Sequence, residues 1–522
     1  GANAIHHWHG MFALALYDER LGEVICLRDR AGVKPFSYYW KNDVFIFGSE
    51  LKSITSHPAF EKELDRNAVA SFLQYGYVAH PHCIYRHTHK LQPGFLLRLN
   101  LAAKAIALKQ YWNVYDYYNK PKLKISLPEA IEQTEVILQK AFEYRMVADV
   151  PVGVFLSGGY DSSCVTAMLQ KTSTEKLKTF TIGTEDKKLN EAVYAKEIAA
   201  HLGTDHTEYY CTAKEALDII PELPHYYDEP FADSSAIPTI LVSRMARKKV
   251  TVALSADAGD EIFAGYNRYD YISRYSKKLQ SIPKPVRKMA VAAMDNISSE
   301  HIPYFNRKQN FHSRYDKLKN LLNDPSPSEL LKNLTQVFPK KDIDRLFVQN
   351  ISELPTAHSS RELEEEFYDP LTYMMAADYQ TYMVDDILQK VDRATMSVSL
   401  EGREPFLDQE IIEWAAQLPS EYKYRGGQKK FILKQIVHKY LPREMMERPK
   451  MGFGIPIELW LQNELKELVQ ENLNEASLKE HGLFHVPEVE KMVQGFFNGR
   501  TENHVKIWYL LTFQMWYRHW MK

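Results

Sequence analysis

Short apolar runs alternate with helical patterns between residues 127 and 270. The run at 152–156 ends in small and polar residues, and apolar positions resume with helical spacing at 164–169. The runs at 177–183 and 250–255 read as two further buried strands, and 191–202 as a helix between them. Strands that alternate with helices predict a parallel sheet covered by helices on both faces. The pattern therefore predicts a doubly wound α/β domain.

The first part of the chain has a different pattern, made of short β-rich segments. Segments 10–18, 23–30 and 44–50 are separated by turn residues, and 95–99 with 105–108 predict a hairpin. A helix is expected within 61–76. Residues 115–126 are rich in tyrosine, lysine and proline without an apolar period, which is typical of a linker.

A long amphipathic helix is predicted from Leu127, and residues 270–370 read as helical. We therefore expect three parts: an N-terminal domain over 1–114, a linker over 115–126, and a nucleotide-type α/β domain with a helical C-terminal part over 127–522.

Composition limits the function classes. The 522 residues carry a formal net charge of -2, which gives no general attraction to nucleic acid or to an acidic membrane. The four cysteines form no C-x-x-C pair, and no apolar run reaches the length of a membrane span. Histidines around Pro81 are interpreted as exposed loop residues rather than zinc ligands. We expect a cytoplasmic protein that acts on small molecules.

The turn after the run at 152–156 is the strongest chemical signal. Gly158 and Gly159 leave backbone N–H groups uncovered at the start of a helix, and Ser157, Ser162 and Ser163 add hydroxyl groups. Such a turn is an anion cradle. Its spacing fits neither the Walker A nor the G-x-G-x-x-G template. It resembles the S-G-G-x-D-S-S loop of the N-type ATP pyrophosphatases, which implies that it holds the β- and γ-phosphates while ATP is split into AMP and pyrophosphate.

A second signal follows the run at 250–255. Asp257, Asp260 and Glu261 lie in a turn of small residues, a costly grouping of charge unless cations neutralise it. Mg²⁺ usually binds one or two carboxylates together with phosphate oxygens. We expect Asp161 and Asp260 to hold Mg²⁺. The alternative is an acidic turn that caps the next helix.

These motifs, together with those at 10–18, 28–35, 47–52, 385–396, 401–408, 426–434 and 448–454, resemble the glutamine-dependent asparagine synthetases. The resemblance implies a synthetase domain of the adenine nucleotide alpha hydrolase-like fold. It also implies an α+β N-terminal-nucleophile glutaminase domain before it, present here only in part. Gly1 stands where that class has its nucleophilic cysteine, so we expect the chain as given to use ammonia.

The resemblance also implies roles for single residues. Lys430 is expected to meet the charge that develops at the α-phosphate, and Asp257, which replaces the family's glutamate, to act as general base. Ala256 and Ala258 replace glycines of the family pattern. The set expected to line the ATP site is Leu156, Ser157, Gly158, Gly159, Asp161, Ser162, Ser163, Ile182, Ser255 and Ala256.

The acceptor acid stays open at this point. Segment 227–239 is expected to line its pocket, but it offers Asp233, Ser234 and Ser235 where many relatives have threonines and an arginine that binds the carboxylate of aspartate. Three hypotheses remain: an enzyme that converts aspartate to asparagine, an amidotransferase that acts on a sugar carboxylate, and an inactive nucleotide-binding subunit. A homodimer is considered, and no residue pattern decides the oligomeric state.

Overall fold

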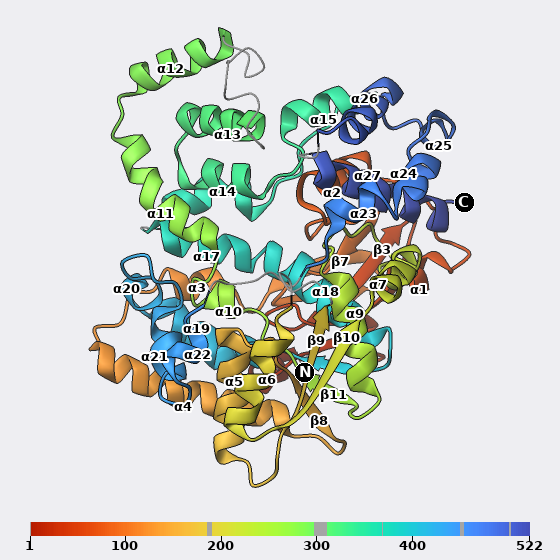
Figure 1. Cartoon of the computed structure of the whole chain (residues 1–522). Coiled ribbons are helices and arrows are strands. Elements are labelled where there is room, and N and C mark those ends of the chain that lie inside the picture. Colours follow the sequence, from red (N-terminus) through yellow and green to blue (C-terminus); the bar gives the residue numbers. More distant parts are fainter. Residues whose placement is uncertain (1, 185–189, 297–310, 368, 449–453, 501–502) are drawn as a thin grey trace.

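A five-stranded parallel sheet lies at the centre of the computed structural model shown in Figure 1. The structure describes residues 2–184, 190–296, 311–367, 369–448, 454–500 and 503–522. Gly1 and residues 449–453, which carry part of the expectations above, lie outside these ranges. The strand order is β10-β9-β8-β11-β12. Their bounds are β8 Val152–Phe155, β9 Lys178–Thr184, β10 Asp205–Cys211, β11 Val252–Leu254 and β12 Glu401–Arg403.

The predicted doubly wound sheet is confirmed, because both of its faces are covered. Adjacent side chains of a strand point to opposite faces, and here Leu254 joins one apolar core while Ala253 joins another. The first core includes residues of α4, α5 and α6, and the second includes residues of α9 and α18. These helices are α4 Leu127–Met146, α5 Tyr160–Thr172, α6 Ala192–Leu202, α9 Ala236–Arg247 and α18 Gln389–Met396.

Two strands of this sheet were not predicted from the sequence. β10 is an edge strand whose residues are mostly polar and only partly buried, so it lacks the continuous apolar run of a central strand. β12 has three residues, two of them charged, and comes about 150 positions after its neighbour β11. The strand expected over 250–255 is shorter than predicted, since β11 covers only Val252–Leu254.

Two further groups of helices lie beside the sheet domain, and the described part of 270–370 is helical in large part, as expected. The green to teal helices in Figure 1 form one group and the blue C-terminal helices another. The first group comprises α11 Asn267–Gln280, α12 Lys284–Asn296, α13 Phe311–Asn323, α14 Pro327–Thr335 and α17 Pro370–Tyr379. The second comprises α23 Ile457–Gln462, α24 Lys466–Asn472, α25 Glu475–Lys479, α26 Val486–Phe497 and α27 His504–Trp520.

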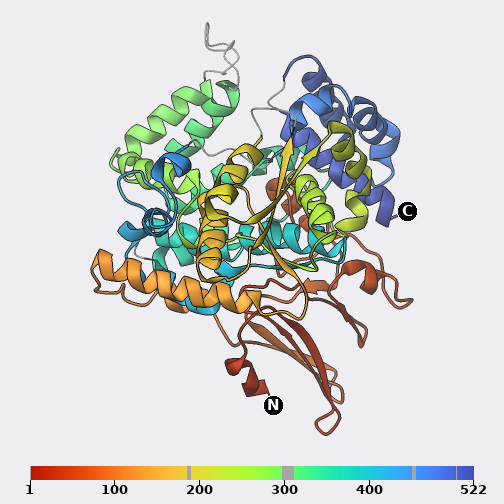
Figure 2. The same ribbon diagram turned by 60° about the horizontal axis from the view of Figure 1, so that its bottom comes forward.

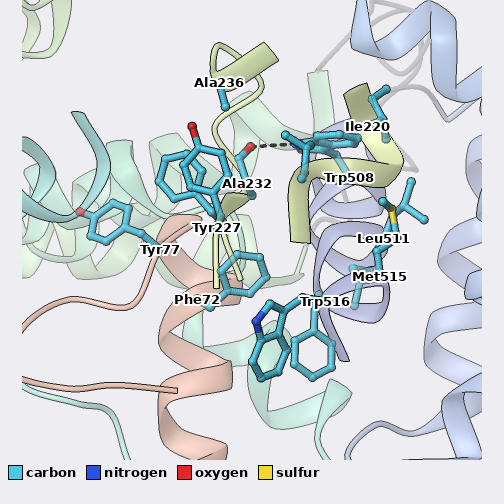
Figure 3. Close-up of a cluster of buried hydrophobic side chains, with 14 of the residues drawn as sticks. Phe72, Tyr77, Ile220, Tyr227, Ala232, Ala236, Trp508, Leu511, Met515 and Trp516 are labelled. Atoms are coloured by element: carbon cyan, nitrogen blue, oxygen red, sulfur yellow. Dashed lines mark hydrogen bonds between the residues drawn. The ribbon is translucent and has the colours of Figure 1, made fainter. Parts of the chain in front are cut away.

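The C-terminal helix α27 fixes the segment that leads into α9. The indole N–H of Trp508 donates to the carbonyl of Ala232 at 2.7 Å, and that of Trp516 donates to the carbonyl of Asp228 at 3.0 Å. Figure 3 shows these indoles in an apolar cluster with Phe72, from α2 (Arg66–Tyr75) in the N-terminal region, and with Tyr227. The far end of the chain therefore holds the segment expected to line the acceptor pocket.

The N-terminal region has the expected α+β character. It contains two antiparallel sheets, one of which projects below the rest of the molecule in Figure 2. The first has the order β1-β2-β6-β7, with β1 Ala13–Asp18, β2 Glu23–Arg28, β6 Phe95–Asn100 and β7 Ala105–Gln110. The second has the order β4-β3-β5, with β3 Ser37–Lys41, β4 Val44–Gly48 and β5 Thr88–Lys90. The hairpin of β6 and β7 is confirmed.

Three local expectations in this part need correction or refinement. The helix expected within 61–76 begins only at Arg66, where the Asp65 carboxylate caps it by accepting from two backbone N–H groups. The segment read as a linker begins inside a short helix, α3 (Val114–Tyr118), whose two end residues are buried. His80 is buried, not exposed, and its Nδ1 lies 2.7 Å from the Asp385 carboxylate. Among the described helices, none combines the length and apolar character needed to cross a membrane.

Candidate active site

The glycine turn between β8 and α5 has the geometry expected of an anion cradle. Leu156 continues the sheet by donating its N–H to Phe180 at 2.9 Å, and α5 begins at Tyr160. Gly158 has φ of 78°, a backbone conformation that favours glycine. A Cβ on Gly158 would also lie 2.7 Å from the guanidinium of Arg448. Backbone conformation and lack of space both require glycine here.

The serines of this turn organise its backbone. The hydroxyl of Ser162 accepts from the N–H of Ser157 at 3.2 Å, and the hydroxyl of Ser157 accepts from the N–H of Gly159 at 3.3 Å. The two hydroxyls are 3.0 Å apart. Ser163 lies deeper, because its side chain is completely buried. The structure thus brings Ser157, Gly159 and Ser162 together and separates Ser163 from them.

Lys430 brings the two predicted metal-binding acids together. It lies directly before α21 (Phe431–Val437), and its Nζ is bonded to the Asp161 carboxylate and, at 2.5 Å, to Oδ1 of Asp260. Burial alone would lower the pKa of Lys430, but attraction to both carboxylates outweighs this effect and raises it above the ordinary value. A permanent positive charge therefore lies beside the glycine turn.

Two glycines make room for this cluster. A Cβ on Gly259, the first residue of α10 (Gly259–Ile262), would lie 2.6 Å from Oδ1 of Asp161. A Cβ on Gly265 would overlap the Asp260 carboxylate and the side chain of Lys430. The small residues around these acids are therefore required by the close approach of the charged groups.

The segment after β11 carries the predicted general base. The N–H of Ser255 donates to the carbonyl of Arg403 at 2.8 Å, and its hydroxyl donates to the Asp257 carboxylate. Ala256 is partly buried beside them. Ala258 has φ of 74°, which explains why the family pattern has glycine at this position. The third acid, Glu261, is turned inward, where burial and the charge of Asp260 raise its pKa to about 7.

Leu156 and Ile182, which were expected to line the adenosine site, lie near the carboxyl ends of neighbouring strands: Leu156 directly follows β8, and Ile182 lies near the end of β9. Both are almost fully buried, at 1 % and 5 % exposure. Ile182 also lines a small cavity with Thr184, Cys211 and Gly454. Ligands of open α/β sheets gather at this carboxyl edge.

A buried lysine, Lys390 of α18, contacts the segment 227–239 and was missed from the sequence. Nζ of Lys390 donates to Oδ2 of Asp233 at 3.1 Å and to the hydroxyl of Ser235 at 3.0 Å. Burial alone would raise the pKa of Asp233, but Lys390 and hydrogen bonds from Ser235 outweigh it and hold the pKa below its ordinary value. Lys390 belongs to the motif at 385–396, for which the sequence indicated no role. Segment 227–239 lacks the arginine that many relatives have, and α18 supplies a cation beside it instead.

A cavity of about 340 Å³ opens beside this pair. Its wall includes Arg268, whose guanidinium binds the Asp378 carboxylate through Nε at 3.0 Å and Nη2 at 2.8 Å. Burial and the neighbouring Asp233 raise the pKa of Asp386, which also lines the cavity. The polar and aromatic lining residues are Tyr75, Tyr77, Asp233, Ser234, Arg268, Thr335, Tyr382, Asp386, Trp508 and Tyr509.

Arg448 is a second residue whose role the sequence did not reveal. Its Nη2 donates to the carbonyl of Gly158 at 2.5 Å, and its guanidinium lies 3.7 Å from the centre of the Tyr194 ring. Both contacts hold a cation against the glycine turn. The motif at 448–454 gave the only sequence signal, and most of it lies outside the described residues.

The donor set at the turn suits magnesium better than a metal held by protein alone. Within the described ranges, no group of three or more His, Cys, Asp and Glu side chains is arranged to hold a metal ion. Asp161 and Asp260, however, approach the same nitrogen beside the phosphate cradle. Two carboxylates that face phosphate oxygens are a usual Mg²⁺ environment.

Comparison with known proteins gives consistent matches over most of the chain. The asparagine synthase family matches residues 133–518, and the glutamine amidotransferase domain matches residues 1–112. Asparagine synthetase [glutamine-hydrolyzing] 1 of Bacillus subtilis is 30% identical over 97% of this chain and 77% of its own length.

Two further relatives carry similar names. Putative asparagine synthetase [glutamine-hydrolyzing] 2 of Methanocaldococcus jannaschii is 39% identical over 55% of this chain and 57% of its own length. A putative asparagine synthetase [glutamine-hydrolyzing] of Mycobacterium bovis is 29% identical over 98% of this chain and 78% of its own length.

Proposed function

Because the chain belongs to the asparagine synthase family, we propose that it uses ATP to convert aspartate into asparagine, with release of AMP and pyrophosphate. The observation that carries this proposal is the cluster of Lys430, Asp161 and Asp260 beside the glycine turn. A lysine held between two carboxylates at a phosphate cradle suits a reaction that separates pyrophosphate from the α-phosphate.

The first step is activation of the acceptor. A carboxylate is a poor electrophile, because its charge repels nucleophiles and it lacks a leaving group. Attack of the carboxylate on the α-phosphate forms an acyl-adenylate and releases pyrophosphate. The backbone of the turn, with Ser157 and Ser162, binds phosphate oxygens, and Lys430 stabilises the charge that develops.

Magnesium would be held by Asp161 and Asp260, where it would screen the charge of the pyrophosphate. Arg448 keeps the turn in place through the Gly158 carbonyl.

The second step is amide formation. Ammonia attacks the acyl carbon, AMP leaves with the electrons of the broken C–O bond, and Asp257 accepts a proton from the nitrogen. Lys390 orients the acceptor region through Asp233 and Ser235. The match of residues 1–112 to a glutamine amidotransferase domain supports glutamine as the ordinary source of ammonia.

The decisive experiment is exchange of labelled pyrophosphate into ATP, with a panel of carboxylic acids. We expect exchange that depends on aspartate, and formation of asparagine when ammonium is added. Asp161→Asn should abolish exchange, whereas Asp218→Asn, in an exposed pair with Lys214, should not. Exchange with a uronic acid but not with aspartate would favour the sugar-carboxylate acceptor. Absence of exchange with every acid would refute the proposal.

A further inference from the structure

Glu404 is a buried acid that the reaction described above does not use. It directly follows β12, whose neighbour β11 leads into Asp257, so the two acids leave adjacent strands at the same edge of the sheet. Only 2 % of Glu404 is exposed. Within the part of the chain that the structure describes, its Oε2 is buried and has no hydrogen-bond partner. A buried, ionised carboxylate oxygen in this state is costly unless a proton or a ligand binds it.

The charged groups around Glu404 come from three other segments. Lys34 and Asp29 belong to the N-terminal region, Asp392 to α18, and Asp257 to the turn after β11. Lys34 is the cation of this group, and it is already paired with Asp392 at 3.1 Å. Asp29 accepts hydrogen bonds from the backbone N–H groups of residues 31, 33 and 34. Arg28 faces both Asp29 and Asp392, and Arg393 faces Asp392. Asp257 is therefore the acid of this group without a cation beside it among the groups named, and it and Glu404 could together attract a small cation.

Burial raises the pKa of Glu404 to about 8, with Lys34 opposing the shift and Asp257 adding to it. A carboxyl group in this range can take up and release a proton near neutral pH. An ordinary exposed glutamate would stay ionised there and would be a weak base.

The position of this group suggests what the ligand is. Glu404 lies where the N-terminal region, which matches a glutamine amidotransferase domain, contacts the synthetase sheet. Apart from Mg²⁺, which Asp161 and Asp260 would hold, the small cation that this reaction can use is ammonium. Ammonium carries N–H donors for an unpaired carboxylate oxygen, and it must lose a proton before its nitrogen can act as a nucleophile.

We propose that Glu404 binds ammonium at the contact between the amidotransferase region and the synthetase sheet and removes one of its protons. This inference rests on the proposed function. The N–H bond of ammonium breaks, its proton passes to a carboxylate oxygen of Glu404, and the electron pair stays on nitrogen. The resulting ammonia attacks the acyl carbon as AMP leaves, and Asp257 takes the second proton from the new amide nitrogen.

The test compares two nitrogen nucleophiles in Glu404→Gln, which keeps the size of the side chain. Ammonium must be deprotonated, whereas hydroxylamine is largely neutral at pH 7.5 and needs no such step. We expect kcat/KM for ammonium to fall by about 100-fold, since a general base typically contributes this much. The hydroxylamine-dependent rate should change by less than about twofold, and the ammonium-dependent rate should rise more steeply with pH than in the wild type.

Two controls separate this role from a structural one. Glu401→Gln changes an acid of the strand that directly precedes Glu404. Its side chain is 46% exposed and paired with Arg403, so the substitution should leave both rates unchanged. Pyrophosphate exchange with aspartate should be the same in Glu404→Gln as in the wild type. If the wild type shows no exchange, the proposed function fails.

Other results would overturn the inference alone. Equal losses with ammonium and hydroxylamine, or lost exchange in Glu404→Gln, would show a structural role. An unchanged kcat/KM for ammonium would show no role. If Glu404→Gln does not fold, Glu404→Asp retains the acid and should show a smaller loss, again confined to ammonium; a loss with both nucleophiles would again overturn the inference.

Discussion

Replacement of Gly259 by alanine tests the charged cluster by steric means alone. Gly259 starts α10, and its φ lies outside the left-handed region, so the backbone accepts an alanine. The added Cβ would lie 2.6 Å from both Cγ and Oδ1 of Asp161 and 3.2 Å from its Cβ. Ordinary van der Waals contact begins at 3.4 Å. The Asp161 carboxylate must therefore move by about 0.8 Å.

This shift should impair activity far more than stability. The group that must move is the end of a side chain, so we expect a loss of unfolding free energy of about 1 kcal/mol, the low end for overpacking. A displacement of about 1 Å in a reacting constellation can cost about 100-fold in rate. We expect kcat/KM for adenylation to fall by about 10- to 100-fold.

The assay is aspartate-dependent pyrophosphate exchange, read together with thermal unfolding. Gly495→Ala is the matched control, because its Cβ would meet nothing closer than Arg500 at 3.5 Å and it lies inside α26. This control should keep full exchange and gain about 0.5–1 kcal/mol, since alanine favours a helix over glycine. Wild-type exchange in Gly259→Ala would refute the view that Asp161 must stay in place.

Further predictions concern charged groups. Lys430→Met should lower the rate of pyrophosphate exchange by about 100- to 1000-fold, as expected for loss of a cation that stabilises the transition state. Lys439→Met, which removes a partly exposed pair with Glu135, should leave the rate unchanged. Equal exchange rates in the two variants would exclude the proposed role of Lys430. Arg448→Ala should raise KM for ATP by about tenfold, because it removes a charged hydrogen bond to the turn; Arg443→Ala, at an exposed site, is its control. Burial lowers the pKa of Lys423 to about 7. Between pH 7 and 10 the unfolded state therefore binds more protons than the folded state, so the unfolding free energy of the wild type should rise with pH relative to that of Lys423→Met. Chemical denaturation at several pH values measures this difference. The prediction is wrong if the unfolding free energies of the two proteins change in parallel with pH.

The features that the sequence predicted well depend on neighbours along the chain. The glycine turn needs only an apolar strand, a residue with positive φ and a helix start, and all three lie within 152–172. The same holds for the cap that Asp65 gives to α2 and for the hairpin of β6 and β7. The resemblance showed that Ala258 replaces a glycine of the family pattern, and its φ of 74° is a physical reason for glycine at that position.

The features that the sequence missed are contacts between distant segments. β10 and β12 form by pairing with the central strands β9 and β11. The residues of β10 are too polar, and those of β12 too few, to indicate a strand by themselves. Arg448 and Lys390 have ordinary local surroundings and gain their roles only from the turn at Gly158 and from Asp233.

The charges at the site show why sequence alone could not rank its acids. Asp257, Asp260 and Glu261 are almost equivalent in sequence, but the fold gives one of them Ser255, one Lys430 and one a buried position with Tyr266. Glu404 differs from an ordinary exposed glutamate because the fold buries it and places Asp257 and Lys34, both distant in the chain, beside it. A carboxylate takes its protonation state from such partners. The chemistry of each acid is therefore a property of the assembled site, which local sequence signals cannot supply.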